Sequence, residues 1–191
     1  MYLLALNGSP KPEGNTAALL QVVLDEAAQL GAETELVQVN EIMLQQEKPY
    51  CQACSSPCTA ACFRGTELER IYAKMSRADA IILGSPVYFG TVSAQLKAFW
   101  DKTRCLRTDK QLINKVGAAV SSGGARFGGQ ETTLRALHDM LLVQGMTVVG
   151  DGYAADDAGH HGSCAQQPAS EDEFARKRAA ILARRLVEMV K

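Results

Sequence analysis

The chain has 191 residues and a formal net charge of −1, with 20 Lys and Arg against 21 Asp and Glu. This length suits one domain with a sizeable core, and without a basic run or acidic tail we expect no nucleic-acid or membrane partner. No apolar stretch reaches the roughly 20 residues of a membrane span, and no signal-peptide pattern opens the chain, so the sequence predicts a cytoplasmic protein.

Short apolar runs alternate with helical patterns along the chain. In chain order the prediction is strand 2–7, helix 16–30, strand 33–39, helix 66–77, strand 78–84, helix 92–104, strand 116–121, helix 130–144 and strand 146–150. Gly31 should stop the first helix. Residues 151–168 are rich in Gly, Asp, His and Gln and are predicted to form a loop. The last helix should then begin with a capping box made by Ser170 and Glu173.

Strands that alternate with helices imply an α/β fold, in which a parallel sheet is covered on both faces. Five strands in this length predict a flavodoxin-like, doubly wound sheet with strand order 2-1-3-4-5. We expect a single domain over residues 1–191, with a cysteine-rich insertion at about 45–65. Such sheets bind ligands outside the carboxyl ends of their strands, where the strand order reverses.

The loop after the first predicted strand, "NGSPKPEGNT", is suited to an anion. Glycines and short polar residues can turn backbone N–H groups and hydroxyls toward a phosphate, and the following helix start adds further donors. Lys11 is its only cation, which suits a phosphate monoester better than a triphosphate with magnesium. The loop matches neither a Walker loop nor a dinucleotide fingerprint. The alternative is a strand-to-helix turn that needs Gly and Pro only for its shape.

Two further loops follow the third and fourth strands. The turn "PVYFG" presents Tyr88 and Phe89, which could stack on a flat conjugated ring; alternatively they pack on a neighbouring helix or subunit. The loop "SSGGARFGGQE" has four glycines within residues 123–129, which allow close approach of a ligand; alternatively it is flexible and empty. A phosphate site beside a site for a flat ring describes flavin mononucleotide (FMN).

The segments "GSPKPEGNT", "GSPVYFGTVSAQLKAFWDK" and "SSGGARFGGQETTLRALHDMLLVQGMTVVGDG" together resemble the NADPH-dependent FMN reductase-like flavoproteins. More narrowly, they resemble the iron–sulfur flavoproteins of anaerobic microbes, over residues 1–152. The resemblance implies that FMN carries the redox chemistry, so we expect no catalytic acid or base in the chain. It also implies NAD(P)H as co-substrate and a homodimer or homotetramer with each flavin near a subunit interface. The FMN-binding residues that it implies are Ser9, Lys11, Gly14, Asn15, Thr16, Pro86, Val87, Tyr88, Phe89, Gly90, Ser122, Gly123, Gly124, Gly129 and Gln130.

Four of the six cysteines lie in "CQACSSPCTAAC", with the spacing C-x2-C-x3-C-x3-C. The thiols of Cys51, Cys54, Cys58 and Cys62 could hold a 4Fe–4S cluster or a zinc ion. Free or disulfide-forming thiols are the remaining alternative. Iron–sulfur flavoproteins carry a compact four-cysteine motif at this place, usually with two-residue gaps between the first three cysteines and a longer last gap. The spacing here departs from that form, so the alternatives stay open.

Two redox functions follow, and a third reading is a phosphate-binding module without redox chemistry. The first is an NAD(P)H-dependent FMN or quinone reductase that passes electrons between FMN and an iron–sulfur cluster. The second is an electron-transfer flavoprotein that shuttles electrons between partners such as ferredoxin, without a direct NAD(P)H site.

Overall fold

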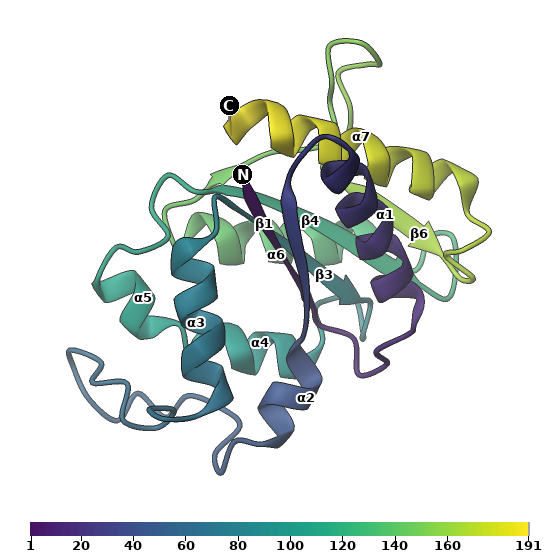
Figure 1. Ribbon diagram of the computed structural model, residues 1–191. Helices are drawn as coiled ribbons and strands as arrows, with labels where there is room; N and C mark the ends of the chain where they lie inside the picture. Colours follow the sequence, from purple (N-terminus) through teal and green to yellow (C-terminus); the bar gives the residue numbers. More distant parts are fainter. Residues whose placement is uncertain (191) are drawn as a thin grey trace.

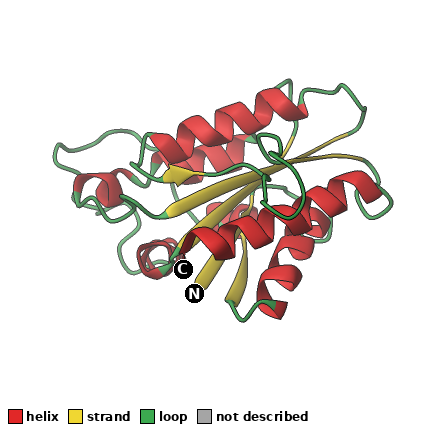
Figure 2. Ribbon diagram, turned by 90° about the horizontal axis from the view of Figure 1, so that it is seen from above, coloured by secondary structure: helices red, strands yellow, loops and turns green. Residues whose placement is uncertain are grey.

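The structure is a computed structural model that describes residues 1–190. A six-stranded parallel sheet lies between two layers of helices (Figure 1, Figure 2). The elements are β1 (Tyr2–Asn7), α1 (Asn15–Gln29), β2 (Glu33–Gln38), α2 (Val39–Leu44), α3 (Glu67–Arg77), β3 (Ala80–Pro86), α4 (Ala94–Asp101), α5 (Arg104–Thr108), β4 (Val116–Gly123), α6 (Gln130–Leu142), β5 (Thr147–Val148), β6 (Ser163–Gln166) and α7 (Glu173–Val190). Among these helices of residues 1–190, none is both long and apolar enough to cross a membrane.

The strand order β2-β1-β3-β4-β5 confirms the flavodoxin-like arrangement. β1 pairs with β2 on one side and with β3 on the other, so that Leu3 lies opposite both Thr34 and Ala80. Both β1 and β3 are buried nearly throughout, as expected for the inner strands of a parallel sheet. Because β1 connects to a helix on one face and β3 to helices on the other, the strand order reverses between them.

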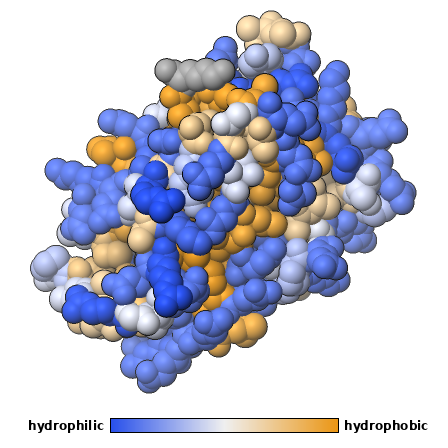
Figure 3. Space-filling model, in the orientation of Figure 1, coloured by the Kyte–Doolittle hydropathy of each residue, from blue (hydrophilic) through white to orange (hydrophobic). Residues whose placement is uncertain are grey.

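The edge strand β2 is mostly half-buried, and only Val37 is fully buried. Figure 3 views the molecule from the same side as Figure 1, where β2 lies in front. Apolar surface forms a band across the middle of this face, and hydrophilic side chains cover most of the rest.

The prediction of a structureless loop at residues 151–168 is wrong, because β6 lies within it. β6 pairs with the carboxyl half of β4, where Val120 lies opposite Ser163. β5 is only two residues long and pairs with the amino half of β4, where Val116 lies opposite Thr147. The sheet thus has six strands rather than five. The sequence SCAQ of β6 has no apolar run, so only its pairing with β4 makes it a strand.

Two further predicted boundaries are wrong. Residues 92–104 do not form one helix: α4 ends at Asp101, and the Thr103 hydroxyl donates to the Trp100 carbonyl at 2.6 Å. A threonine that bonds the backbone in this way competes with the helical ladder, and α5 starts at the next residue. The segment 39–44, expected to end a strand and enter the cysteine segment, forms the short helix α2.

The core has two parts, one on each face of the sheet. α1 and α7 pack side by side on one face, and α2, α3, α4 and α6 supply apolar side chains to the other. Gly31 ends α1 as predicted: its φ is +88°, and the Ala32 N–H donates to the Ala27 carbonyl at 3.0 Å. This is a Schellman C-cap.

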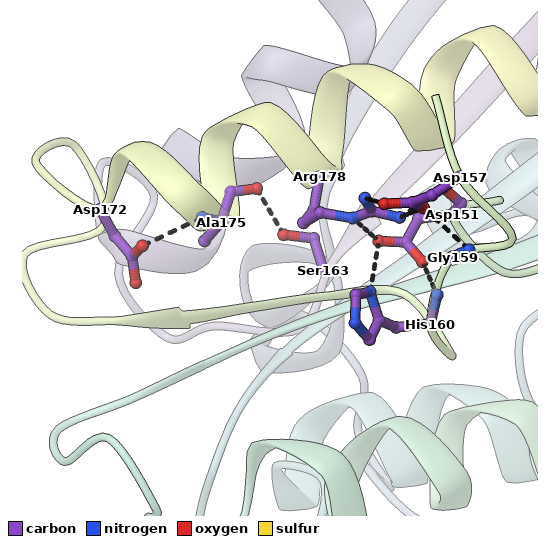
Figure 4. Close-up of polar contacts among 8 residues, drawn as sticks. All are labelled: Asp151, Asp157, Gly159, His160, Ser163, Asp172, Ala175 and Arg178. Carbon is purple, nitrogen blue, oxygen red and sulfur yellow. Dashed lines mark hydrogen bonds and ion pairs between the residues drawn. The ribbon is translucent and has the colours of Figure 1, made fainter. Parts of the chain in front are cut away.

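The start of α7 differs from the predicted capping box. Asp172, rather than Ser170, caps the helix, since its carboxylate accepts the Ala175 N–H at 3.0 Å (Figure 4). The same carboxylate accepts the Gln166 N–H at 2.8 Å. Asp172 therefore joins the end of β6 to the start of α7, a contact that a local capping pattern does not predict.

Arg178 of α7 fastens the segment between β5 and β6. It is only 4% exposed, and its guanidinium bonds the buried carboxylate of Asp151 and, at 2.9 Å and 3.0 Å, that of Asp157 (Figure 4). Asp151 also accepts the His160 N–H. A buried cation thus faces two carboxylates, which is how proteins accommodate buried charge.

Candidate functional site

Three loops meet at the carboxyl ends of β1, β3 and β4, as the sequence predicts. The hydroxyls of Thr16 and Ser122, both buried, lie 2.8 Å apart and link the first loop to the third. The Ser93 hydroxyl donates to the Gly8 carbonyl at 2.6 Å and links the first loop to the segment after β3. The Val87 N–H donates to the Ser122 carbonyl at 2.9 Å. The predicted residues of the three loops are therefore neighbours in space.

The first loop presents a helix start without a side-chain cap. Gly14 is the N-cap residue of α1. Among residues 1–190, no acceptor is found for the N–H groups of Asn15, Thr16 and Ala17. Unpaired donors at a helix N-terminus fit a phosphate. Ser9 shapes the approach to them, because its hydroxyl accepts the Lys11 N–H at 3.1 Å.

Lys11 and Asn15, two other predicted FMN-binding residues of this loop, have different surroundings. Lys11 is exposed at the rim. The Asn15 side chain instead turns toward α7, where its oxygen accepts the Ala169 N–H at 2.9 Å. Asn15 thus also holds the connection from β6 to α7 against the first loop.

The second loop is a tight turn with an exposed aromatic tip. Tyr88 and Thr91 exchange backbone hydrogen bonds of 3.0 Å and 3.2 Å, and Phe89 and Gly90 have φ values of +48° and +82°. Positive φ at both central residues is the pattern of a type I′ turn. Phe89 is fully exposed and Tyr88 is 44% exposed. The Phe89 ring is therefore not covered by another helix of this chain, and stays available to a flat ring or to another subunit.

The third loop is organised from within by Gln130. Its side-chain oxygen accepts the Gly128 N–H at 2.9 Å, and its amide nitrogen donates to the Ala125 carbonyl at 2.6 Å. A Cβ at Gly123 would lie 2.7 Å from that nitrogen, so the glycine makes room for Gln130. The exposed stretch 124–128 remains free to contact a ligand.

The second and third loops are also joined to each other. Thr132 of α6 donates its hydroxyl to the Gly90 carbonyl at 2.9 Å. A Cβ at Gly129, whose φ is +98°, would lie 3.3 Å from the Gly90 Cα and from a Val87 methyl. The hydrogen bond from Thr132 and the close approach of Gly129 to Gly90 and Val87 keep the aromatic turn against the start of α6.

Two open cavities flank the three loops. One, of about 830 Å³, lies between the third loop and the connection from β6 to α7, and Phe127, Phe174 and Cys164 are among its lining residues. The other, of about 870 Å³, lies beside Tyr88 and Phe89 and runs between α4 and α6. Both aromatic loop tips thus border space that a second molecule can enter.

The cysteine segment is the long connection from α2 to α3, which extends below α3 in Figure 1. All four thiols are free; Cys54 and Cys62 are exposed, and Cys51 and Cys58 are half-buried. Within the described chain, no three His, Cys, Asp or Glu side chains converge closely enough to hold a metal ion. The structure gathers the four thiols in one segment but does not bring them to one point.

Nitrogen donors nevertheless face this segment. The Ala53 N–H donates to the Cys51 sulfur at 3.5 Å, and the Lys102 ammonium donates to the Cys62 sulfur at 3.7 Å. The Arg104 guanidinium donates to the Ser55 carbonyl at 3.2 Å and ties the segment to α5. Thiols with N–H donors directed at their sulfurs fit a thiolate-bound metal centre in chemistry.

A fifth cysteine, Cys105, lies outside the four-cysteine motif in the sequence but close to Cys58 in the structure. The pKa of the Cys105 thiol is raised to about 11, mainly because the thiol is partly buried and also because Cys58 lies nearby. Tyr72 is a buried neighbour of these cysteines. Its burial is the main reason why the pKa of its phenol lies well above the ordinary range, and Cys105 and Cys62 raise this pKa further. The run "WDKTRC" carries Lys102, Arg104 and Cys105, and nothing in its local sequence pattern connects these residues with the cysteine segment. Cys164 remains remote, in the first cavity.

Comparison with known proteins agrees with this geometry. The NADPH-dependent FMN reductase family matches residues 1–161. An iron-sulfur flavoprotein of Methanocaldococcus jannaschii is 40% identical over 100% of this chain and 98% of its own length. An NAD(P)H dehydrogenase (quinone) of Trichlorobacter lovleyi is 33% identical over 73% of this chain and 67% of its own length. The solved structure of a flavodoxin from the domain Archaea is 16% identical, covers 100% of this chain and 99% of its own, and has a TM-score of 0.60, which shows the fold.

Proposed function

The chain belongs to the NADPH-dependent FMN reductase family, and on that premise we propose that it is an FMN-dependent oxidoreductase. It takes electrons from NAD(P)H and passes them between FMN and an iron–sulfur cluster. The observation that carries the proposal is the meeting of the three loops through the Thr16–Ser122 and Ser93–Gly8 contacts.

The residues of the first loop suit the phosphate end of FMN. The N–H groups of Asn15, Thr16 and Ala17 supply donors and the positive end of the α1 dipole. Lys11, exposed at the rim, adds a cation, and the buried Ser9 and Thr16 hydroxyls suit the phosphate or the ribityl chain. The Gly14 position lets the backbone reach the phosphate without a side chain in the way.

The other two loops suit the ring. Pro86 ends β3 and Val87 follows it, and the type I′ turn after them leaves the Tyr88 ring half-exposed beside the cavity between α4 and α6. The exposed backbone at Gly124 can approach the opposite edge of the ring. FMN, when bound, supplies both two-electron and one-electron redox chemistry. The chain's contribution would be to hold and orient the ring through the residues of these two loops.

The cysteine segment would hold the second redox group. Cys51, Cys54, Cys58 and Cys62 are the proposed ligands of a 4Fe–4S cluster, and zinc is the alternative metal. A cluster supplies one-electron transfer. The support is the full-length similarity to a protein named as an iron-sulfur flavoprotein, together with the free thiols and the N–H donors aimed at two of them.

A second candidate is an electron carrier between proteins. Phe89 is fully exposed and borders an open groove that includes Tyr88, Trp100 and Val143. An apolar rim of this kind suits a protein partner such as a ferredoxin, or a second copy in a homodimer or homotetramer. The mass of the assembly in light scattering tests the second possibility.

Anaerobically purified protein tests the main proposal. We expect a yellow-brown protein that releases FMN on heating and shows the absorption of an iron–sulfur cluster at around 400 nm. NADPH or NADH should bleach the flavin in a stopped-flow experiment. Bleaching by reduced ferredoxin alone would favour the carrier, and a colourless protein without bound FMN would reject both.

A further inference from the structure

Lys102 is an unusual lysine. It follows α4 directly and is only 2% exposed, whereas lysines are almost never fully buried unless paired. No Asp or Glu of residues 1–190 forms an ion pair with it. Its ammonium has the sulfur of Cys62, 3.7 Å away, as its hydrogen-bond partner.

The other buried cation among residues 1–190 shows what is missing. Arg178, at 4% exposure, is matched by the carboxylates of Asp151 and Asp157 (Figure 4). Lys97, which is exposed and lies five residues before Lys102, pairs with Asp101 at 2.5 Å. Lys102 alone among these three has no carboxylate, and a buried ammonium without an anion beside it is strongly unfavourable.

We infer that Lys102 is the counter-charge of the cysteine site, a positioning residue for an anionic metal centre bound by the four thiols. Four thiolates around a 4Fe–4S cluster or a zinc ion carry net negative charge, and this charge would complete the environment of the Lys102 ammonium. Free neutral thiols would not. The inference rests on the proposed function, and it distinguishes a metal centre from free thiols, which the cysteine spacing leaves open.

A fixed positive charge beside the centre has a defined effect. It favours the more negative, reduced state of a cluster and raises its reduction potential. It also makes the metal-free protein less stable, because the ammonium then lies buried without an anion. Removing the charge should therefore stabilise the metal-free protein and make the cluster of the metal-loaded protein harder to reduce.

The test uses three variants of the whole chain. Lys102→Met removes the charge and keeps the length of the side chain, and Lys102→Arg keeps the charge. Lys115→Met is the matched control, because Lys115 is a partly buried lysine that donates to the Ala78 carbonyl at 2.6 Å, away from the cysteines. Iron, sulfide and FMN per chain are measured first, followed by EPR-monitored redox titration of the cluster and thermal unfolding with and without it.

We expect the Lys102→Met cluster to be harder to reduce, by about tenfold in the one-electron equilibrium, or ~59 mV. In Lys102→Arg the reduction equilibrium of the cluster should stay within about threefold of the wild type, and in Lys115→Met it should not shift. Without metal, Lys102→Met should unfold about 2–4 °C above the wild type, and this advantage should disappear on loading. If Lys102→Met does not fold, Lys102→Gln takes its place.

Equal potentials and equal metal-free stability in Lys102→Met and the wild type would overturn the counter-charge role, while the cluster proposal stands. A wild type that binds FMN but takes up neither iron and sulfide nor zinc would overturn the counter-charge role together with the cluster proposal. The FMN content, measured on the same sample, reports separately on the flavin proposal.

Discussion

The three loops at the ends of β1, β3 and β4 and the cysteine segment are built in different ways. The loops are joined by short contacts between distant residues, such as Thr16 with Ser122 at 2.8 Å, 106 positions apart in the chain. The cysteine segment is mostly exposed, and its thiols do not converge. A pocket for an organic cofactor can be preformed by backbone and hydroxyl groups, whereas a metal site often acquires its geometry only with the metal.

The largest expected effect is the complete loss of the iron–sulfur cluster when one of its proposed ligands is removed. Cys58→Ser removes one proposed ligand, and we expect the iron–sulfur cluster to be lost while FMN stays bound, because the two sites share no residue. Iron, sulfide and FMN per chain provide the measurement. Cys164→Ser is the control, since Cys164 lines the cavity beside the third loop, and it should retain both groups. Full cluster content in Cys58→Ser would show that Cys58 is not a ligand.

A change in the preformed pocket should do the opposite. A Cβ at Gly8 would lie 2.7 Å from a Leu96 methyl and 2.9 Å from the Gly84 carbonyl, so Gly8→Ala must displace the first loop. Such overpacking costs about 1–3 kcal/mol, which corresponds to FMN binding roughly 5- to 150-fold weaker. Fluorescence titration with FMN measures it, and the cluster should be unaffected.

Gly124→Ala is the comparison in the same pocket, because the contact proposed for Gly124 is made by its backbone and an added Cβ would face Gln167. The nearest atom to its added Cβ is 3.4 Å away on the flexible Gln167 side chain. We expect FMN affinity within about threefold of the wild type, since surface substitutions usually change stability by less than ~0.5 kcal/mol. An equal loss in both variants would mean that the close approach at Gly8 is not what shapes the pocket.

Removing the metal should loosen only the cysteine segment. After chelation under anaerobic conditions, proteolytic cleavage within residues 51–62 should be about tenfold faster, because local opening becomes about 1.4 kcal/mol easier. FMN affinity should change little. Cleavage sites identified by mass spectrometry, with and without metal, provide the measurement; unchanged cleavage would show that the segment is ordered without a metal.

The smallest effect concerns the support of the flavin side. Asp172→Ala removes the cap of α7 and the bond to β6, which should cost about 1 kcal/mol and lower Tm by about 2–4 °C. Ser170→Ala, which alters the residue that a local capping pattern selects, should leave Tm within about 1 °C. Calorimetry on both proteins tests it, and the reverse order would support the predicted capping box.

Much of the fold could be predicted because its signals are local. Apolar runs mark β1 and β3, and Gly31 marks the end of α1. The loops that follow these strands could be located for the same reason, and the fold brings them together as expected. The assignment of individual FMN-binding residues stays a prediction, and Gln130 shows why: its side chain is bonded within its own loop.

The sequence by itself determined the order of strands and helices, and with it the edge at which the three loops meet, because periodicity and turn residues act over a few positions. Only the tertiary structure decided three other features. β6 is a strand because β4 pairs with it, and Asp172 displaces Ser170 as the cap because the end of β6 lies beside it. Lys102 and Cys105 join the cysteine segment because the end of α4 and the start of α5 lie against it. The first and the third depend on hydrogen bonds or burial shared by residues far apart in the chain, and the second on a bond from the end of β6, six residues before Asp172. A predicted capping box records none of these contacts.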